Sequence, residues 1–209
     1  MFKDIREKRS SMSYLILVLL WVLFYFFHSV FASLNIKRKF KAVMGRYYIW
    51  YRLLYSIFAT FHFLLIFVYS ATLIEQRMLN QSPLFTYIGY MLAGLGTIIL
   101  VKSFKHFSNL KFVGLTLHDD LKEKEKLITK GIHEYIRHPI YTGLILIFLG
   151  YFFYQPSPSS MVHFIMLLAY LPFGIHFEEK KLIATYGEDY RKYKKAVPSL
   201  FPFKLKKTA

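Results

Sequence analysis

The segment Gly131-Ile-His-Glu-Tyr-Ile-Arg-His-Pro-Ile-Tyr141 carries residue types that could hold a ligand. Arg137 and His138 directly precede Pro139, and proline fits the first position of a helix, where its missing N–H costs nothing. We therefore expect Arg137 and His138 at the positive end of a helix. That is a favourable place for an anion such as a ligand carboxylate.

A second candidate segment, Pro172-Phe-Gly-Ile-His-Phe-Glu-Glu179, ends a long apolar run with two adjacent carboxylates. Glu178 and Glu179 could accept hydrogen bonds from hydroxyl or ammonium groups. His133, His138 and His176 are the imidazoles that could accept a proton. The scattered histidines lack the spacing of metal ligands and the chain has no cysteine, so we expect no metal.

The elements that position these segments follow from composition. Hydrophobic residues make up 55% of the 209 residues, while the formal net charge is +16. The chain is rich in aromatic residues, which disordered chains lack, so it is not disordered. It has no cysteine, so it is not a disulfide scaffold. A nucleic-acid binder with a large core and a multi-pass membrane protein remain, and the long uncharged runs favour the membrane protein.

Four uncharged runs predict an all-α bundle of five transmembrane helices. The longest run, His138–Phe177, holds two spans, because Gln155-Pro-Ser-Pro-Ser-Ser160 supplies a turn in its middle. The predicted spans cover residues 12–34, 49–74, 84–106, 139–154 and 160–177. The first is read as a helix and not a signal peptide, because its apolar stretch is too long and no cleavage pattern follows.

Charge predicts the orientation. With five spans, one side of the membrane holds 23 of the Lys and Arg residues and the other holds 5. The positive-inside rule then places the C-terminus in the cytoplasm and the N-terminus outside, although the N-terminus is itself basic. The last two spans are antiparallel neighbours, so their polar ends should meet at the cytoplasmic face and form a site. The residues expected there are Arg137, His138, Tyr141, His176, Glu178 and Glu179.

Within the spans, small residues predict close helix packing. Gly89, Ala93 and Thr97 recur at four-residue spacing, with Gly94 and Gly96 beside them. His28 and His62 also lie within spans. An ionisable residue there is a functional candidate, but a single neutral histidine bonded to a neighbouring helix is the simpler interpretation.

The C-terminal motifs resemble the isoprenylcysteine carboxyl methyltransferase family of integral membrane methyltransferases. The matching pattern covers about 80 residues: Arg137-His-Pro-x-Tyr141, Glu178-Glu-x-x-Leu182, Tyr186-Gly-Glu-Asp-Tyr190-x-x-Tyr193, Val197-Pro198 and Phe201-Pro202. In the N-terminal half, His28-Ser29, Tyr51-Arg-Leu-Leu-Tyr55 and Phe112-Val-Gly-Leu115 look more like the NnrU-like and methanethiol methyltransferase branch.

This resemblance implies S-adenosyl-L-methionine as methyl donor, bound at the cytoplasmic ends of the last two helices. It implies that the C-terminal segment 186–202 folds back over the cofactor. It also implies a three-span region over residues 1–111 and a catalytic region over 112–209, in one integrated domain. The implied catalytic residues are Arg137, Glu178 and His176, and the implied cofactor-binding residues are Gly131, His133, Tyr135, His138, Tyr141, Glu178 and Glu179.

The sequence departs from the isoprenylcysteine pattern at Gly174, where those enzymes typically carry an arginine four residues before the first glutamate, and at His133, where they often carry Tyr or Phe. The lost arginine weakens the case for a prenylcysteine carboxylate as acceptor. We therefore expect a membrane methyltransferase acting on a lipophilic or small thiol or carboxylate acceptor. The alternatives are a non-catalytic NnrU-like accessory protein and, less favoured, an NADPH-dependent enzyme resembling sterol reductases. We expect lipid and no nucleic acid as partners, in what we take to be a prokaryotic plasma membrane.

Overall fold

The computed structural model describes residues 2–73, 77–80, 82–105, 113–119, 121–122 and 126–202. The described residues form helices and connecting segments, with no strand among them, which confirms the all-α class. In chain order the elements are α1 (Phe2–Ala32), α2 (Leu34–Met44), the 3₁₀ helix η1 (Gly45–Trp50), α3 (Tyr51–Ala71), α4 (Pro83–Phe104), the 3₁₀ helix η2 (Gly131–Glu134), α6 (Pro139–Tyr154), α7 (Pro158–Tyr186) and α8 (Glu188–Ala196).

Among the described residues, four helical stretches are long and apolar enough to cross a membrane. They are Ser11–Ala32, Leu34–Ala71, Pro83–Phe104 and Pro158–Tyr186. The shorter α6 is also apolar, but its 16 residues span about 24 Å at about 1.5 Å each, against a hydrocarbon core of about 30 Å. Three expected positions lie outside the described residues. They are the span ends at 74 and 106 and the boundary between the two regions at 111–112.

Serine and proline set the starts of two of these helices. The side chain of Ser82 accepts a hydrogen bond from the Phe85 amide, and Pro83 occupies the first turn of α4. Ser157 and Ser160 form a capping box at the start of α7. Both arrangements satisfy amides that have no partner within the helix. The Gln155–Ser157 turn therefore lies where the sequence predicted it, and α6 and α7 run antiparallel.

Helices α4 and α6 pack backbone to backbone through glycines. A Cβ atom built on Gly89 would lie 2.8 Å from the carbonyl oxygen of Gly150, and one built on Gly96 would lie 2.6 Å from that of Gly143. No real side chain fits at such distances, so these glycines permit the contact. Gly94 meets nothing within 4 Å. The expected small-residue packing of this helix is confirmed at Gly89 and Gly96.

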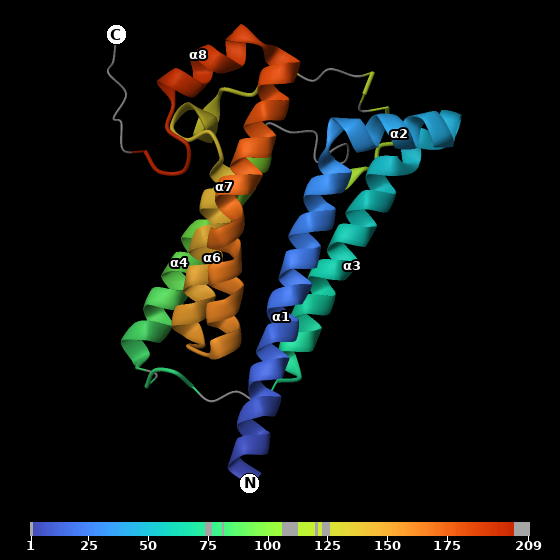
Figure 1. Cartoon of the computed structure of the whole chain (residues 1–209). Helices are drawn as coiled ribbons and strands as arrows, with labels where there is room; N and C mark the ends of the chain where they lie inside the picture. Colours follow the sequence, from blue (N-terminus) through green and yellow to red (C-terminus); the bar gives the residue numbers. More distant parts are fainter. Residues whose placement is uncertain are drawn as a thin grey trace.

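Figure 1 shows two groups of helices, α1 with α3 and α4 with α6 and α7, and α2 lying across the ends of α1 and α3. A buried hydrogen-bonded network joins the groups. Trp21 on α1 donates to His163 Nδ1 on α7 at 2.8 Å, and His163 Nε2 lies 3.2 Å from the Ser70 hydroxyl on α3. His163 is fully buried, with both ring nitrogens occupied, so it fixes α1, α3 and α7 relative to one another.

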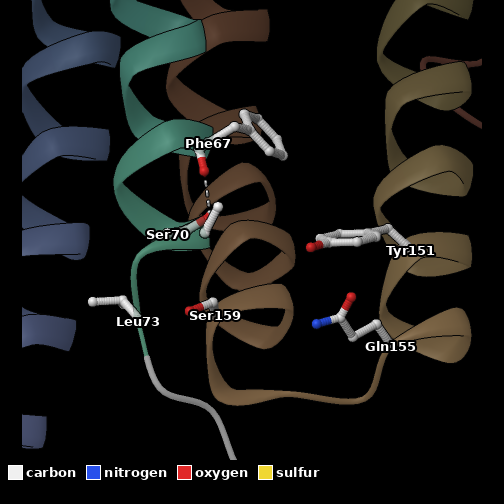
Figure 2. A pocket seen from close by; sticks show the side chains of 7 residues that line it. Phe67, Ser70, Leu73, Tyr151, Gln155 and Ser159 are labelled. Carbon is white, nitrogen blue, oxygen red and sulfur yellow. Dashed lines mark hydrogen bonds between the residues drawn. The ribbon is translucent and has the colours of Figure 1, made fainter.

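A cavity of about 520 Å³ lies beside this network, at the end of the bundle away from α8. Figure 2 shows Tyr151 of α6 and Gln155, which directly follows that helix, facing Ser70 of α3 and Ser159 of α7 across it. Its polar lining consists of hydroxyl and amide groups, so it is a neutral cavity. It differs from the charged cluster at the opposite end of the molecule, which consists of Arg137, His138, Tyr141, Glu178 and Glu179.

Candidate active site

Arg137 and Glu179 form the centre of the charged cluster. The guanidinium donates to Glu179 Oε1 from Nε at 3.0 Å and from Nη2 at 2.7 Å, and the two side chains are 9% and 7% exposed. A further amino group, Nη1, donates to the carbonyl oxygens of Lys194 and Val197. The Lys194 ammonium lies 2.5 Å from Glu179 Oε2. Both oxygens of the Glu179 carboxylate are thus engaged by cations of the chain itself.

His138 lies between the two glutamates. Its Nε2 is 3.2 Å from Glu179 Oε1, and its Nδ1 is 3.4 Å from Glu178 Oε2. The Tyr141 hydroxyl is also hydrogen-bonded to Glu178. Glu178 differs from Glu179 because its side chain is 44% exposed and no lysine or arginine is ion-paired with it at close range among the described contacts. The Glu178 carboxylate is therefore the hydrogen-bond acceptor of the cluster that a ligand can reach.

The C-terminal segment folds back onto the start of α6. The amides of Arg137 and His138 donate to the carbonyl oxygens of Pro198 and Ser199 at 2.9 and 3.0 Å, and the Thr142 hydroxyl donates to that of Leu200 at 2.6 Å. The sequence led us to expect an anion at this helix start. These two amides precede α6 and are bonded within the chain, and an anion at the first turn of α6 itself stays a prediction.

Helix α8 is tied to the same region by Tyr193, whose hydroxyl donates to the His133 carbonyl oxygen at 2.6 Å. Burial raises the pKa of Tyr193 to about 12, against the opposing influence of the Arg137 charge. The neutral, donating form of the phenol is therefore retained throughout the physiological pH range. Tyr190, the other aromatic residue of this helix, is almost fully buried.

The structure brings together Arg137, His138, Tyr141, Glu178 and Glu179, as the sequence predicted. His133 is buried under α8, and Gly131 has a φ of 66°, a conformation that favours glycine. His176 and Tyr135 are exposed, and the His176 ring contacts Phe177. Within the described part of the chain, no hydrogen bond or ion pair joins His176 or Tyr135 to the charged cluster.

One turn before Glu178, the space beside Gly174 is filled by aromatic residues. A Cβ on Gly174 would lie 2.8 Å from the Tyr170 ring and 3.3 Å from the Tyr141 hydroxyl. Tyr170 is held in place by Tyr25, which stacks on it at 4.1 Å, and by Ser29, whose hydroxyl lies 3.0 Å from its own. A long side chain at position 174 would have to displace this ring.

The N-terminal motifs that carried the family resemblance meet in space. The Tyr55 hydroxyl on α3 lies 2.8 Å from His28 Nδ1 on α1, and Gly114 packs against the backbone of Arg52 and Leu53 at the start of α3. Gly114 has a φ of 84°, and any side chain there would collide with that backbone. Phe112, the first residue of that motif, lies outside the described residues.

Some residues that matter to this geometry had no distinctive signal in the sequence. Lys194 is one of several basic residues in the C-terminal segment, and Tyr170 is one of 17 tyrosines. His163 could have been found, because it is an ionisable residue within an apolar run, the same criterion that drew attention to His28 and His62.

Comparisons with known proteins match this part of the chain to one family. The model of the phospholipid methyltransferase family matches residues 84–189, from α4 through the charged cluster to the start of α8. The chain is 33% identical over 129 residues to a methanethiol S-methyltransferase of Crocosphaera subtropica, covering 58% of this chain and 49% of that protein.

Two further relatives carry the other activity that the motifs suggested. A protein-S-isoprenylcysteine O-methyltransferase B of Arabidopsis thaliana is 27% identical over 117 residues, covering 56% of this chain and 55% of that protein. The corresponding enzyme of Schizosaccharomyces pombe is 34% identical over 77 residues, covering 36% and 33%. The chain therefore spans about half the length, or less, of these curated relatives. No solved structure matched the chain. The resemblance to isoprenylcysteine carboxyl methyltransferase-like enzymes is confirmed.

Proposed function

The chain belongs to the phospholipid methyltransferase family, and we propose that it is a membrane enzyme that transfers a methyl group from S-adenosyl-L-methionine to a lipophilic or small acceptor. The observation that carries the proposal is the charged cluster, which lies within the matched region and contains one accessible carboxylate, Glu178. When bound, the cofactor supplies an electrophilic methyl group on a sulfonium sulfur.

The residues present fit such a cofactor. Glu178 can accept hydrogen bonds from an ammonium group or from ribose hydroxyls, and its half-exposed side chain leaves it within reach of a ligand. The Tyr141 ring lies beside it, with its centroid 5.7 Å from that of the buried His138, and is proposed to offer an aromatic face to a cationic sulfur. The other proposed cofactor residues are Gly131 and His133 in η2 and Tyr135 directly after it, which would line the cofactor pocket.

Arg137 and Glu179 are proposed to position this site. Glu179 is neutralised by Arg137 and Lys194, and Arg137 in turn holds the carbonyl oxygens of the C-terminal segment. Together they fix His138, the residue that touches both carboxylates. A network of this kind holds reacting groups in place, and methyl transfer needs positioning and the exclusion of water more than it needs acid–base chemistry.

The proposed membrane arrangement has five spans, because α6 is added to the four long apolar helices, and it puts the charged cluster on the cytoplasmic side. Helix α6 packs along α4 through paired glycines over nearly its whole length, so it occupies the same layer as helices that are long enough to cross. The excess of Lys and Arg on the side of α8 supports the cytoplasmic assignment.

The surroundings of Gly174 favour a thiol acceptor over a prenylcysteine carboxylate. The space that an arginine side chain would need is occupied by Tyr170, which is itself fixed by Tyr25 and Ser29. No cation at this position would bind an acceptor carboxylate. An uncharged acceptor fits an aromatic wall of this kind better.

Methyl transfer by the purified full chain in lipid nanodiscs tests the proposal. Labelled methyl groups from S-adenosyl-L-methionine should appear on an alkanethiol, with less or none on a prenylcysteine carboxylate or a phospholipid amine. Calorimetry should show binding of the cofactor and of its demethylated product. If neither compound binds, the proposed function is wrong. If both bind but no acceptor is methylated, the non-catalytic alternative is correct.

A further inference from the structure

A hydrogen-bonded histidine and tyrosine on α1 and α3 lie near the charged cluster but have no part in holding the cofactor. The Tyr55 hydroxyl is 2.8 Å from His28 Nδ1, 3.5 Å from Nε2 and 3.3 Å from the His28 carbonyl oxygen. Because a phenol has one proton, the hydroxyl donates either to the carbonyl oxygen or to a ring nitrogen, and the choice follows the tautomer of His28. In the tautomer with a proton on Nδ1, the hydroxyl accepts at Nδ1 and donates to the carbonyl, and Nε2 carries the lone pair of a base.

His28 is connected to the proposed site through its neighbour in sequence. Ser29 bonds to Tyr170 of α7, the Tyr170 ring fills the space beside Gly174, and the Tyr141 hydroxyl at the other edge of that space bonds to Glu178. The groups that interact electrostatically with His28 are Arg52 of the same α3 motif and Glu178 itself. The imidazole is thus within electrostatic range of the accessible carboxylate.

The other histidines near the cluster are less suited to accept a proton from an acceptor. Both ring nitrogens of His138 face carboxylates. His133 is buried beneath α8, and His176 is exposed beside Phe177. A thiol has a reference pKa of about 8.5 and reacts as the thiolate, so its methylation benefits from a base near the sulfur.

We infer that His28, held by Tyr55, is the base that deprotonates a thiol acceptor in this enzyme. The S–H bond breaks and its proton passes to Nε2 of His28. The thiolate sulfur then forms a bond to the methyl carbon as the bond from that carbon to the sulfonium sulfur breaks. The products are a neutral methyl thioether and the neutral demethylated cofactor, and the imidazolium returns its proton to solvent. This inference rests on the proposed methyl transfer.

The test compares His28→Gln with a matched control, His62→Gln. His62 is the other histidine of the first two spans, and its ring contacts Phe24, Phe27 and Phe58. With an alkanethiol, His28→Gln should lower kcat about a hundredfold or more, the usual contribution of a general base. With a strongly acidic arenethiol, which is already ionised at neutral pH, it should lower kcat little. Tyr55→Phe should give an intermediate loss, and His62→Gln should behave as wild type.

A second readout does not depend on turnover. In the complex with the demethylated cofactor, an added alkanethiol should show the ultraviolet absorbance of a thiolate with wild type but not with His28→Gln, while cofactor affinity is the same in both. Equal losses on both thiols, or none, would overturn the inference. So would methylation by wild type of a carboxylate or amine but of no thiol, although the methyltransferase function would then stand. Absence of cofactor binding would instead refute the proposed function.

Discussion

Glu178 and Glu179 are adjacent in the sequence but lie in different surroundings. Glu179 is 7% exposed and is neutralised by Arg137 and Lys194, whereas Glu178 is 44% exposed and bonds to His138 and Tyr141. A buried carboxylate with two cationic partners fixes a structure, and a half-exposed carboxylate with no close lysine or arginine ion pair can bind a ligand. The sequence predicted that both acids would gather with Arg137 and His138. It could not tell them apart, because Lys194 approaches only after the chain folds back.

Replacing Arg137 with lysine tests the positioning role at the residue scale. Lysine keeps the charge but lacks the fork that bonds Glu179 and the Lys194 and Val197 carbonyl oxygens together. We expect Arg137→Lys to cost about 1–3 kcal/mol in the free energy of unfolding, the cost of buried groups left without a partner. Amide hydrogen exchange in residues 187–202 should become faster.

The control for this prediction is Arg191→Lys, on the exposed face of α8, where the arginine pairs with Glu188 at 3.4 Å and both side chains are more than half exposed. It should leave stability and exchange unchanged. Equal protection of residues 187–202 in wild type and Arg137→Lys would show that the guanidinium does not hold the C-terminal segment.

At the scale of the elements, helix positions were more predictable than helix contacts. The apolar run, Pro139 and the Gln155 turn gave the bounds of α6, because these local signals act within a few residues. The small residues of α4 predicted a close helix contact, but the partner glycines, Gly143 and Gly150, emerged only from the structure. Helix rotation depends on packing between elements, and the sequence pattern of one helix does not set it.

Two glycines of α4 offer a matched test of that contact. Gly96→Ala puts a Cβ 2.6 Å from the Gly143 carbonyl oxygen, so α4 and α6 must move apart. Gly94→Ala adds a methyl where nothing lies within 4 Å and gains helix propensity of up to about 1 kcal/mol. Thermal unfolding in detergent should show a lower midpoint for Gly96→Ala and an unchanged or higher one for Gly94→Ala. The same midpoint for both variants would contradict the contact.

For the whole molecule, the sequence predicted the sorting of charge but not the joining of the two helix groups. The charge bias and the uncharged runs follow from the membrane and can be counted along the chain. The Trp21–His163–Ser70 network and the pairing of His28 with Tyr55 join residues far apart in the sequence. The sequence indicated that His28 would bond to a neighbouring helix, but a single sequence does not identify which residue is the partner.

The orientation is testable because the chain has no cysteine, so a single introduced thiol reports its own side of the membrane. Lys192 lies on the exposed face of α8, and Met78 is exposed at the other end of the bundle, where its amide bonds to the Pro156 carbonyl oxygen. An impermeant reagent on intact cells should label Met78→Cys, and it should label Lys192→Cys only after permeabilisation. The reverse pattern would place the charged cluster outside the cell.

The central claim is that Glu178 holds S-adenosyl-L-methionine, and calorimetric titration of the purified full chain with the cofactor tests it most directly. Loss of a hydrogen bond to a charged group costs about 1.5–3 kcal/mol, so Glu178→Gln should weaken binding by about tenfold or more while thermal unfolding stays close to wild type. Glu188→Gln, which changes an exposed glutamate of α8, should bind as wild type does. Wild-type affinity in Glu178→Gln would contradict the account.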